Sequence, residues 1–217
     1  MSTPSCASFT EKGLREKNED ASLAVEVQGM YLFAVAEGMG GPEEGPSAAE
    51  IAVNALRDGI PQEMTHLPDV LESCLINADT ALYSLQEANP TSEPPAVSMT
   101  LAVVRPGGEC VVNSPGQRKL FFIDRGVHAG EGTDRGEGNE GFLHDPGAGM
   151  HEAHLPPGFL VICSDGVTDF LSDNRILEII SERGDDLDDA CHKIVYEAFQ
   201  NGSDDNMTVV MVRQPET

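Results

Sequence analysis

The order of segments along this chain is the feature that most constrains its fold. Apolar segments of strand type occur in runs, and segments with helical spacing occur in pairs. Strands are predicted over 22–27, 30–36, 99–104, 110–112, 119–124, 159–163 and 207–212, and helices from residue 43 onward and over 67–85, 173–183 and 187–200. A regular alternation of strand and helix would indicate a parallel βαβ sheet, whereas runs and pairs indicate a layered α+β fold.

Two segments are predicted to be loops. Residues 89–95 contain three prolines, and residues 126–149 are rich in Gly, Glu and Asp. Such compositions punctuate regular structure and are typical of connections between elements. The chain has neither an internal repeat nor a recognisable boundary, so a single domain over residues 1–217 is expected.

Composition excludes several classes of function. The chain has 217 residues, 40% of them hydrophobic, which is enough for one domain with a sizeable core. The formal net charge of −24 argues against nucleic acid and anionic membranes as partners, because binding them needs clustered Lys and Arg. Five cysteines without a Cys-x-x-Cys pair argue against a disulfide framework. With no apolar run of membrane-spanning length and no signal-peptide pattern, a cytoplasmic location is expected.

Four short acidic patches are spread from one end of the chain to the other, at 18–20, 36–41, 163–166 and 202–206. Three of them adjoin apolar runs of strand type, at 31–36, 159–163 and 207–212. An acid at the end of a strand, beside a glycine, is held rigidly and exposed. Acids of this kind that converge from distant segments make an oxygen-rich site suited to hard cations such as Mg²⁺ or Mn²⁺.

The order of these patches resembles that of the metal-dependent serine/threonine protein phosphatases of type 2C, including the bacterial phosphatases similar to stage II sporulation protein E. The likeness extends from Gly13 to Val212. It implies an α+β sandwich of two antiparallel sheets, flanked by α-helices on both outer faces. It also implies hydrolysis of phosphoserine or phosphothreonine by a water held between two Mg²⁺ or Mn²⁺ ions, with a phosphorylated regulatory protein as the substrate.

The resemblance also implies roles for individual residues. The metal ligands that it suggests are Glu19, Asp20, Glu37, Gly38, Asp165 and Asp205. Within this set, the catalytic acids are Asp20, Glu37, Asp165 and Asp205. Glu37 stands at the position of the bridging carboxylate, Gly38 offers its backbone carbonyl, and Glu19 acts largely through water. Asn206 matches a supporting asparagine, and Arg15 matches an arginine that binds the substrate phosphate.

Three departures from the family pattern bear on activity. The bridging residue is normally aspartate, and the additional methylene of Glu37 moves the carboxylate by about an ångström, a displacement that can alter rates about 10²-fold. Gly116 replaces an aspartate that binds a third metal ion in many members, so no third site is expected. The region around 126–157 is shorter than the flap subdomain of larger members, which leaves the substrate groove open.

Two hypotheses follow from these departures. The first is an active Mg²⁺- or Mn²⁺-dependent protein phosphatase, favoured by the intact Asp20, Asp165 and Asp205. The second is a catalytically impaired relative that acts as a regulatory or binding module, suggested by Glu37 and Gly116. A cysteine-based phosphatase is excluded because no cysteine is followed six residues later by arginine, and a P-loop is excluded because the chain contains no Gly-Lys pair.

Overall fold

The computed structural model describes residues 3–42, 45–61, 66–90, 92–114, 120–124, 127–131, 150–155 and 157–215. Its strands form two five-stranded antiparallel sheets. The first sheet has the order β1 (Ser5–Glu11), β10 (Met207–Gln214), β9 (Gly158–Cys163), β6 (Leu120–Asp124) and β7 (Val127–Glu131). The second has the order β2 (Asp20–Val27), β3 (Met30–Gly41), β4 (Glu93–Val104), β5 (Glu109–Asn113) and β8 (Met150–His154).

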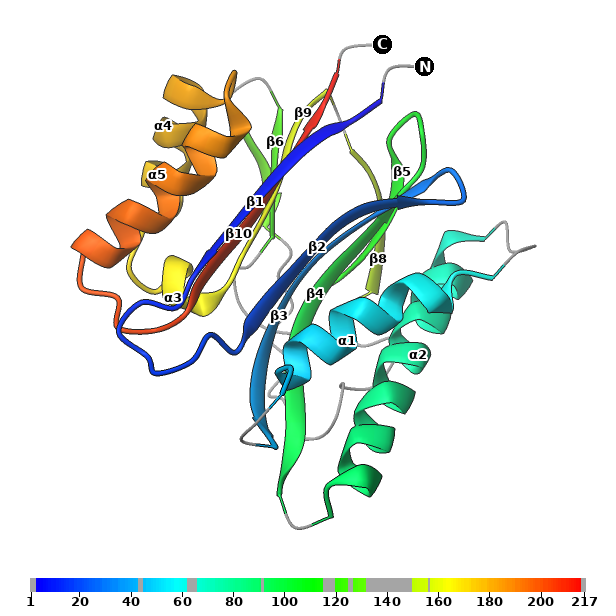
Figure 1. The fold of residues 1–217 in the computed structure, drawn as a ribbon. Coiled ribbons are helices and arrows are strands. Elements are labelled where there is room, and N and C mark those ends of the chain that lie inside the picture. Colours follow the sequence, from blue (N-terminus) through cyan, green and yellow to red (C-terminus); the bar gives the residue numbers. More distant parts are fainter. Residues whose placement is uncertain are drawn as a thin grey trace.

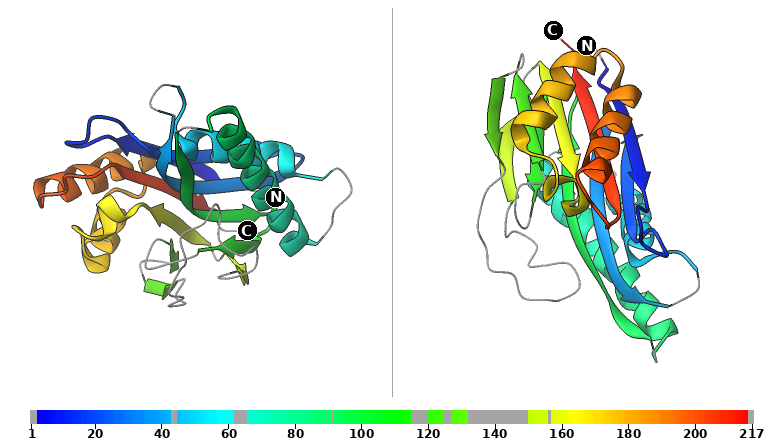
Figure 2. Two further views of the ribbon diagram at one scale, coloured as in Figure 1. Left: turned by 90° about the horizontal axis from the view of Figure 1, so that it is seen from below. Right: turned by 90° about the vertical axis from the view of Figure 1, so that its left-hand side faces the viewer.

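Helices cover the outer face of each sheet (Figure 1). The second sheet carries α1 (Ala48–Leu56), the 3-10 turn η1 (Arg57–Gly59) and α2 (Leu67–Ala88). The first sheet carries α4 (Asp173–Arg183) and α5 (Leu187–Gln200), with the short α3 (Asp165–Thr168) directly after β9. Figure 2 shows the same layers from two further directions. The predicted sandwich with helices on both outer faces is therefore confirmed.

Three separate clusters of buried side chains correspond to the three interfaces between these four layers. Leu32, Leu56 and Leu71 belong to the cluster between the second sheet and α1 and α2. Val161, Ile180 and Ile194 belong to the cluster between the first sheet and α4 and α5. The third cluster, which includes Phe33, Leu160 and Val210, lies between the sheets. Each fully buried apolar side chain contributes about 1.5–3 kcal/mol, so all three interfaces support the layered arrangement.

Local sequence explains the element boundaries. The β2–β3 hairpin turns at Gln28 and Gly29, which both have positive φ (53° and 75°), as the mirror-image turns of hairpins require. Helix α1 begins at a capping box in which Ser47 and Glu50 satisfy each other's backbone amides. The predicted bounds 173–183 and 187–200 match α4 and α5.

The structure corrects the sequence prediction in several segments. Strand β1 was not predicted, because Ser5–Glu11 is mostly exposed and pairs with β10 alone, so it lacks an apolar pattern. Strand β7 lies within 126–149, which was expected to be a loop, and strand β8 was not predicted; each is an edge strand. Strand β4 begins at Glu93 and so includes two of the prolines of the predicted loop. These prolines fall where the β3–β4 register shifts, where the ladder needs fewer amide donors.

None of the helices in the described part of the chain is both long and apolar enough to cross a membrane. All five cysteines are free thiols, and four of them are buried. The expectation of a single domain over 1–217 remains a prediction.

Candidate active site

Asp20 and Glu37 lie directly opposite each other on the β2–β3 ladder. In an antiparallel pair, residues so placed project from the same face with Cβ atoms about 4.5–5.5 Å apart. Asp20 is only 8% exposed. Like charges directly opposite each other on a sheet are destabilising. A cation held between the two carboxylates would offset this repulsion, so the pair favours metal binding.

The facing pair ends the row of side chains that β3 turns toward the other sheet. Phe33 and Val35 belong to the core between the sheets, and Glu37 follows them at the strand period of two. On β10 of the opposite sheet, Val212 and Val210 belong to the same core. The next residue of that row is Thr208, whose hydroxyl reaches Asp20. Both sheets therefore change from apolar to polar at the same end of the sandwich.

Asp165 joins this end of the sandwich from the first sheet. Its backbone amide donates to Glu37 Oε1 at 2.7 Å. The preceding Ser164 is fully buried and is paired twice with Thr208: its amide donates to the Thr208 carbonyl, and its hydroxyl accepts from the Thr208 amide. The serine of the Ser-Asp-Gly patch thus fixes the backbone from which the exposed Asp165 side chain projects.

Cys163 precedes this patch and is fully buried. Burial raises the pKa of its thiol well above the ordinary value. A neutral, buried thiol is a core residue and not a nucleophile.

Asp205 lies close to Gly166, the residue after Asp165. The two segments of chain approach so closely there that residue 166 has no room for a side chain. A Cβ on Gly166 would lie 2.0 Å from the carbonyl oxygen of Asn206 and 3.3 Å from the Asp205 Cβ. The two oxygens of Asp205 have different partners. Oδ1 accepts from the Asn206 amide at 2.8 Å, and Oδ2 accepts from Arg15 at 2.8 Å.

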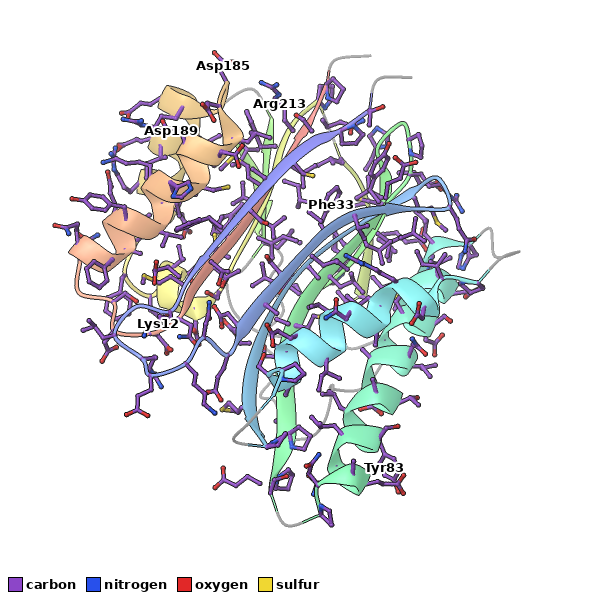
Figure 3. All side chains as sticks on the ribbon, viewed as in Figure 1. Lys12, Phe33, Tyr83, Asp185, Asp189 and Arg213 are labelled. Carbon is purple, nitrogen blue, oxygen red and sulfur yellow. The ribbon has the colours of Figure 1, made fainter. Side chains whose placement is uncertain are left out.

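Asn206 ties the loop between β1 and β2 to the site. Its side-chain amide donates to the carbonyls of Lys12 and Lys17, both at 2.9 Å, and its side-chain oxygen accepts from the Glu19 amide at 2.8 Å. Figure 3 labels Lys12 at the start of this loop, directly after β1. Asn206 thus holds the backbone that carries Arg15 and Glu19, and its supporting role at a metal site stays a prediction.

Two further predicted residues have defined places. Glu19 is exposed, and its carbonyl accepts from the Gly38 amide at 2.9 Å. Gly38 is tightly enclosed, since a Cβ there would lie 3.0 Å from both the Glu19 carbonyl oxygen and the Ala49 amide. A glycine therefore fits best at this point of β3, one residue beyond the facing Asp20–Glu37 pair.

The chemistry of the four acids suits a hard divalent cation, and the segments that carry them meet at one end of the sandwich. All four predicted acids present carboxylate oxygens, the ligands that Mg²⁺ and Mn²⁺ prefer. As they stand, no three acidic, histidine or cysteine side chains of the described residues are gathered closely enough to hold a metal ion. In this arrangement Glu37 accepts from the Asp165 amide, and Asp205 accepts from Arg15. Metal binding would exchange such protein donors for the cation, and Arg15, with a 56% exposed side chain, has room to move.

Sequence reasoning missed Thr10, Thr208 and the role of Ser164. Thr208 is buried and connects Asp20 with Ser164, but a threonine in a strand of β-branched residues carries no motif. Gly116, on which the third-metal prediction rests, lies outside the described residues. The same is true of most of the predicted flap.

Comparison with known proteins agrees with this architecture. Residues 129–207 match the sequence model of the protein phosphatase 2C family. This stretch includes Asp165 and Asp205 but not Asp20 or Glu37. The serine/threonine protein phosphatase PstP of Mycobacterium tuberculosis is 25% identical over 94% of this chain and 44% of its own length. Protein phosphatase 1B of Mus musculus is 37% identical over 57 residues, 25% of this chain and 15% of its own. The chain thus spans less than half the length of these curated relatives.

Solved structures match nearly the whole chain. The catalytic domain of PstP in complex with two manganese ions superposes with a TM-score of 0.77 at 21% identity, covering 98% of this chain and 99% of that one. The chain has the protein phosphatase 2C fold. The serine/threonine phosphatase of S. agalactiae superposes on this type 2C fold with a TM-score of 0.79 at 19% identity, over 99% of this chain and 100% of that one. The resemblance to type 2C phosphatases is thereby confirmed, and the likeness to the sporulation branch stays a prediction.

Proposed function

We propose that this protein is a metal-dependent protein serine/threonine phosphatase that hydrolyses phosphoserine and phosphothreonine. The observation that carries the proposal is the meeting of β2, β3, the start of α3 and the turn before β10 at one end of the sandwich. Each of these segments brings one of the four predicted acids, Asp20, Glu37, Asp165 and Asp205. An anionic chain needs a local source of positive charge to act on a phosphoester, and divalent cations on these acids provide it.

The proposed metal ligands are Asp20, Glu37, Asp165 and Asp205, with Glu19 and the Gly38 carbonyl in supporting places. When bound, two Mg²⁺ or Mn²⁺ ions supply a hydroxide at neutral pH and neutralise charge on the phosphoryl group. The PstP catalytic domain, which shares the fold, was crystallised with two manganese ions. Arg15, on the loop held by Asn206, binds the substrate phosphate with its planar guanidinium group.

The length of Glu37 suits its place in this chain. Its carboxylate spans from β3 to the Asp165 amide, 2.7 Å away, and thereby links the two sheets at the site. This contact supports an adapted site in preference to an impaired one, so the regulatory-module alternative is the less favoured proposal.

The proposed substrate is a phosphorylated regulatory protein, and the proposed setting is signalling in the cytoplasm. Five free cysteines fit a reducing compartment. The net charge of −24 weighs against nucleic acid and anionic membranes as partners.

Hydrolysis of a phosphothreonine peptide with and without added Mn²⁺ tests this function. We expect turnover that requires Mn²⁺ and that Asp165→Ala abolishes. The Asp165 side chain is exposed, and the hydrogen bond to Glu37 is made by the Asp165 backbone amide, which alanine keeps, so the variant should stay folded. If the wild type turned over the peptide no faster than Asp165→Ala at millimolar Mn²⁺, the phosphatase proposal would fail for this substrate. The regulatory or binding module would then be the favoured function.

A further inference from the structure

Three polar side chains behind the site form a continuous hydrogen-bonded chain that ends on Asp20. Asn18 Nδ2 lies 2.8 Å from Thr10 Oγ1, and Thr10 Oγ1 lies 2.7 Å from Thr208 Oγ1. Thr208 Oγ1 lies 2.7 Å from Asp20 Oδ2. This series of hydrogen bonds thus connects the β1–β2 loop, β1, β10 and β2.

The direction of every hydrogen bond in this chain is fixed by its two ends. An ionised carboxylate only accepts, so the single Thr208 proton is donated to Asp20. Thr208 must then accept from Thr10, which in turn accepts from Asn18. The side-chain oxygen of Asn18 accepts from the Asp20 amide at 3.2 Å, which assigns its nitrogen to the Thr10 contact. All donors therefore point toward the Asp20 carboxylate.

Thr208 is the fixed point of this chain. It is fully buried, and its backbone is bonded in both directions to Ser164, the residue before Asp165. Its hydroxyl is thus held on a rigid part of the first sheet while it orients an acid on the second. Hydrogen-bond partners that fix a metal ligand from behind commonly contribute 10- to 100-fold to metal affinity.

We infer that Thr208, supported by Thr10 and Asn18, is a positioning residue for Asp20 as a metal ligand. The inference rests on the proposed function, because it takes Asp20 to bind the cation. The hydroxyl chain holds the Asp20 carboxylate in one orientation before the cation arrives. Metal binding then does not have to immobilise this side chain.

The test measures Mn²⁺ affinity by calorimetry in the full chain. Thr208→Val keeps the shape and removes the hydroxyl, and we expect its Mn²⁺ dissociation constant to rise about tenfold or more. Thr208→Ser restores the hydroxyl and should recover affinity near that of the wild type. Thr10→Val leaves the Thr208–Asp20 hydrogen bond intact but removes the hydroxyl that donates to Thr208. We therefore expect the Mn²⁺ dissociation constant to rise less, by about two- to fivefold.

Thr100→Val is the matched control. Thr100 is equally buried in the second sheet, and its hydroxyl pairs with Ser114 and not with Asp20. It should leave Mn²⁺ affinity unchanged. Peptide hydrolysis separates positioning from a general loss of structure: Thr208→Val should regain wild-type kcat at saturating Mn²⁺, with KM unchanged.

Each outcome decides a different point. Wild-type affinity in a folded Thr208→Val overturns the inference and leaves the phosphatase proposal standing. If the wild type binds no Mn²⁺, the proposed function itself fails. If Thr208→Val does not fold, Thr10→Val and Thr208→Ser carry the test. Wild-type Mn²⁺ affinity in Thr10→Val then overturns the inference. Weaker Mn²⁺ binding by Thr10→Val, together with near-wild-type binding by Thr208→Ser, supports it.

Discussion

The Arg15 guanidinium lies 2.8 Å from Asp205 Oδ2, so the proposed phosphate-binding arginine rests against a proposed metal ligand. The two residues are 190 positions apart, and Asn206 and Gly13 bring them together. The observed contact places the positive charge beside Asp205, where the proposed function needs a partner for the substrate phosphate.

Arg15→Ala tests this role. Charge-assisted hydrogen bonds contribute about 1.5–3 kcal/mol, so we expect KM for a phosphothreonine peptide to rise roughly 10- to 100-fold. The free energy of unfolding should fall by less than about 1 kcal/mol, because the pair is exposed. Arg15→Lys keeps the positive charge but lacks the planar guanidinium group, so its KM should lie between those of the wild type and Arg15→Ala. An unchanged KM in Arg15→Ala would remove Arg15 from the substrate site.

Glu37→Asp tests whether the longer side chain is an adaptation. The shortened carboxylate can no longer span the 2.7 Å contact with the Asp165 amide without movement of the backbone. Displacement of a reacting group by about an ångström lowers rates by about 10²-fold, so we expect kcat to fall by that order. The measurement is peptide hydrolysis at saturating Mn²⁺. A Glu37→Asp variant faster than the wild type would instead identify Glu37 as an impairment.

Gly13→Ala tests the close approach that seats the Arg15 loop. Gly13 has φ of +60°, and a Cβ there would lie 2.3 Å from the Asp205 carbonyl oxygen. Gly29→Ala is the matched control, with φ of +75° and no atom within 4 Å of the added Cβ. Both variants lose about 1–2 kcal/mol from left-handed strain, and the clash adds about 1–3 kcal/mol at Gly13 alone. Urea unfolding should show this difference, and equal losses would argue against the contact.

Acid stability tests the ion-pair network on the outer helices. Hydrogen bonds from Arg175 at 2.7 and 2.8 Å, with a smaller contribution from Lys193, lower the pKa of Glu197 from 4.5 to about 2. Because the folded pKa is the lower one, the stabilisation is fully present above about pH 4.5 and is lost as the pH falls toward 2.

Glu197→Gln removes this titration. We expect the variant to be less stable than the wild type at pH 7, and the difference to shrink progressively below about pH 4.5. Urea unfolding at pH 7, 4 and 3 measures it. A difference that stays constant across this range would mean that Glu197 stabilises by packing and not by charge.

The layered fold could be predicted because its core strands and helices have strong apolar periodicity. Helix α5 and strand β9 show the pattern plainly, since each buries a full apolar stripe or run. The edge strands could not be predicted in this way. Strand β1 pairs with β10 along its whole length and buries only Ala7 fully, with Phe9 partly buried, so its sequence carries little signal.

The candidate site divides along similar lines. Its acids follow a recognisable order, and the structure brings the segments that carry them to one end of the sandwich. The contacts behind them could not be inferred from the sequence. Thr10 and Thr208 are 198 residues apart and meet only because β1 pairs with β10 in one register. Single hydroxyls whose roles depend on such pairing leave no local pattern.

The most direct test of the central claim is to follow bound Mn²⁺ and peptide hydrolysis in the same titration, for the wild type and for Glu37→Ala. The account predicts that turnover rises with the occupancy of two Mn²⁺ ions in the wild type. Both binding and turnover should be strongly reduced in Glu37→Ala. Two ions bound with wild-type affinity in that variant, or wild-type turnover without bound Mn²⁺, would contradict the account.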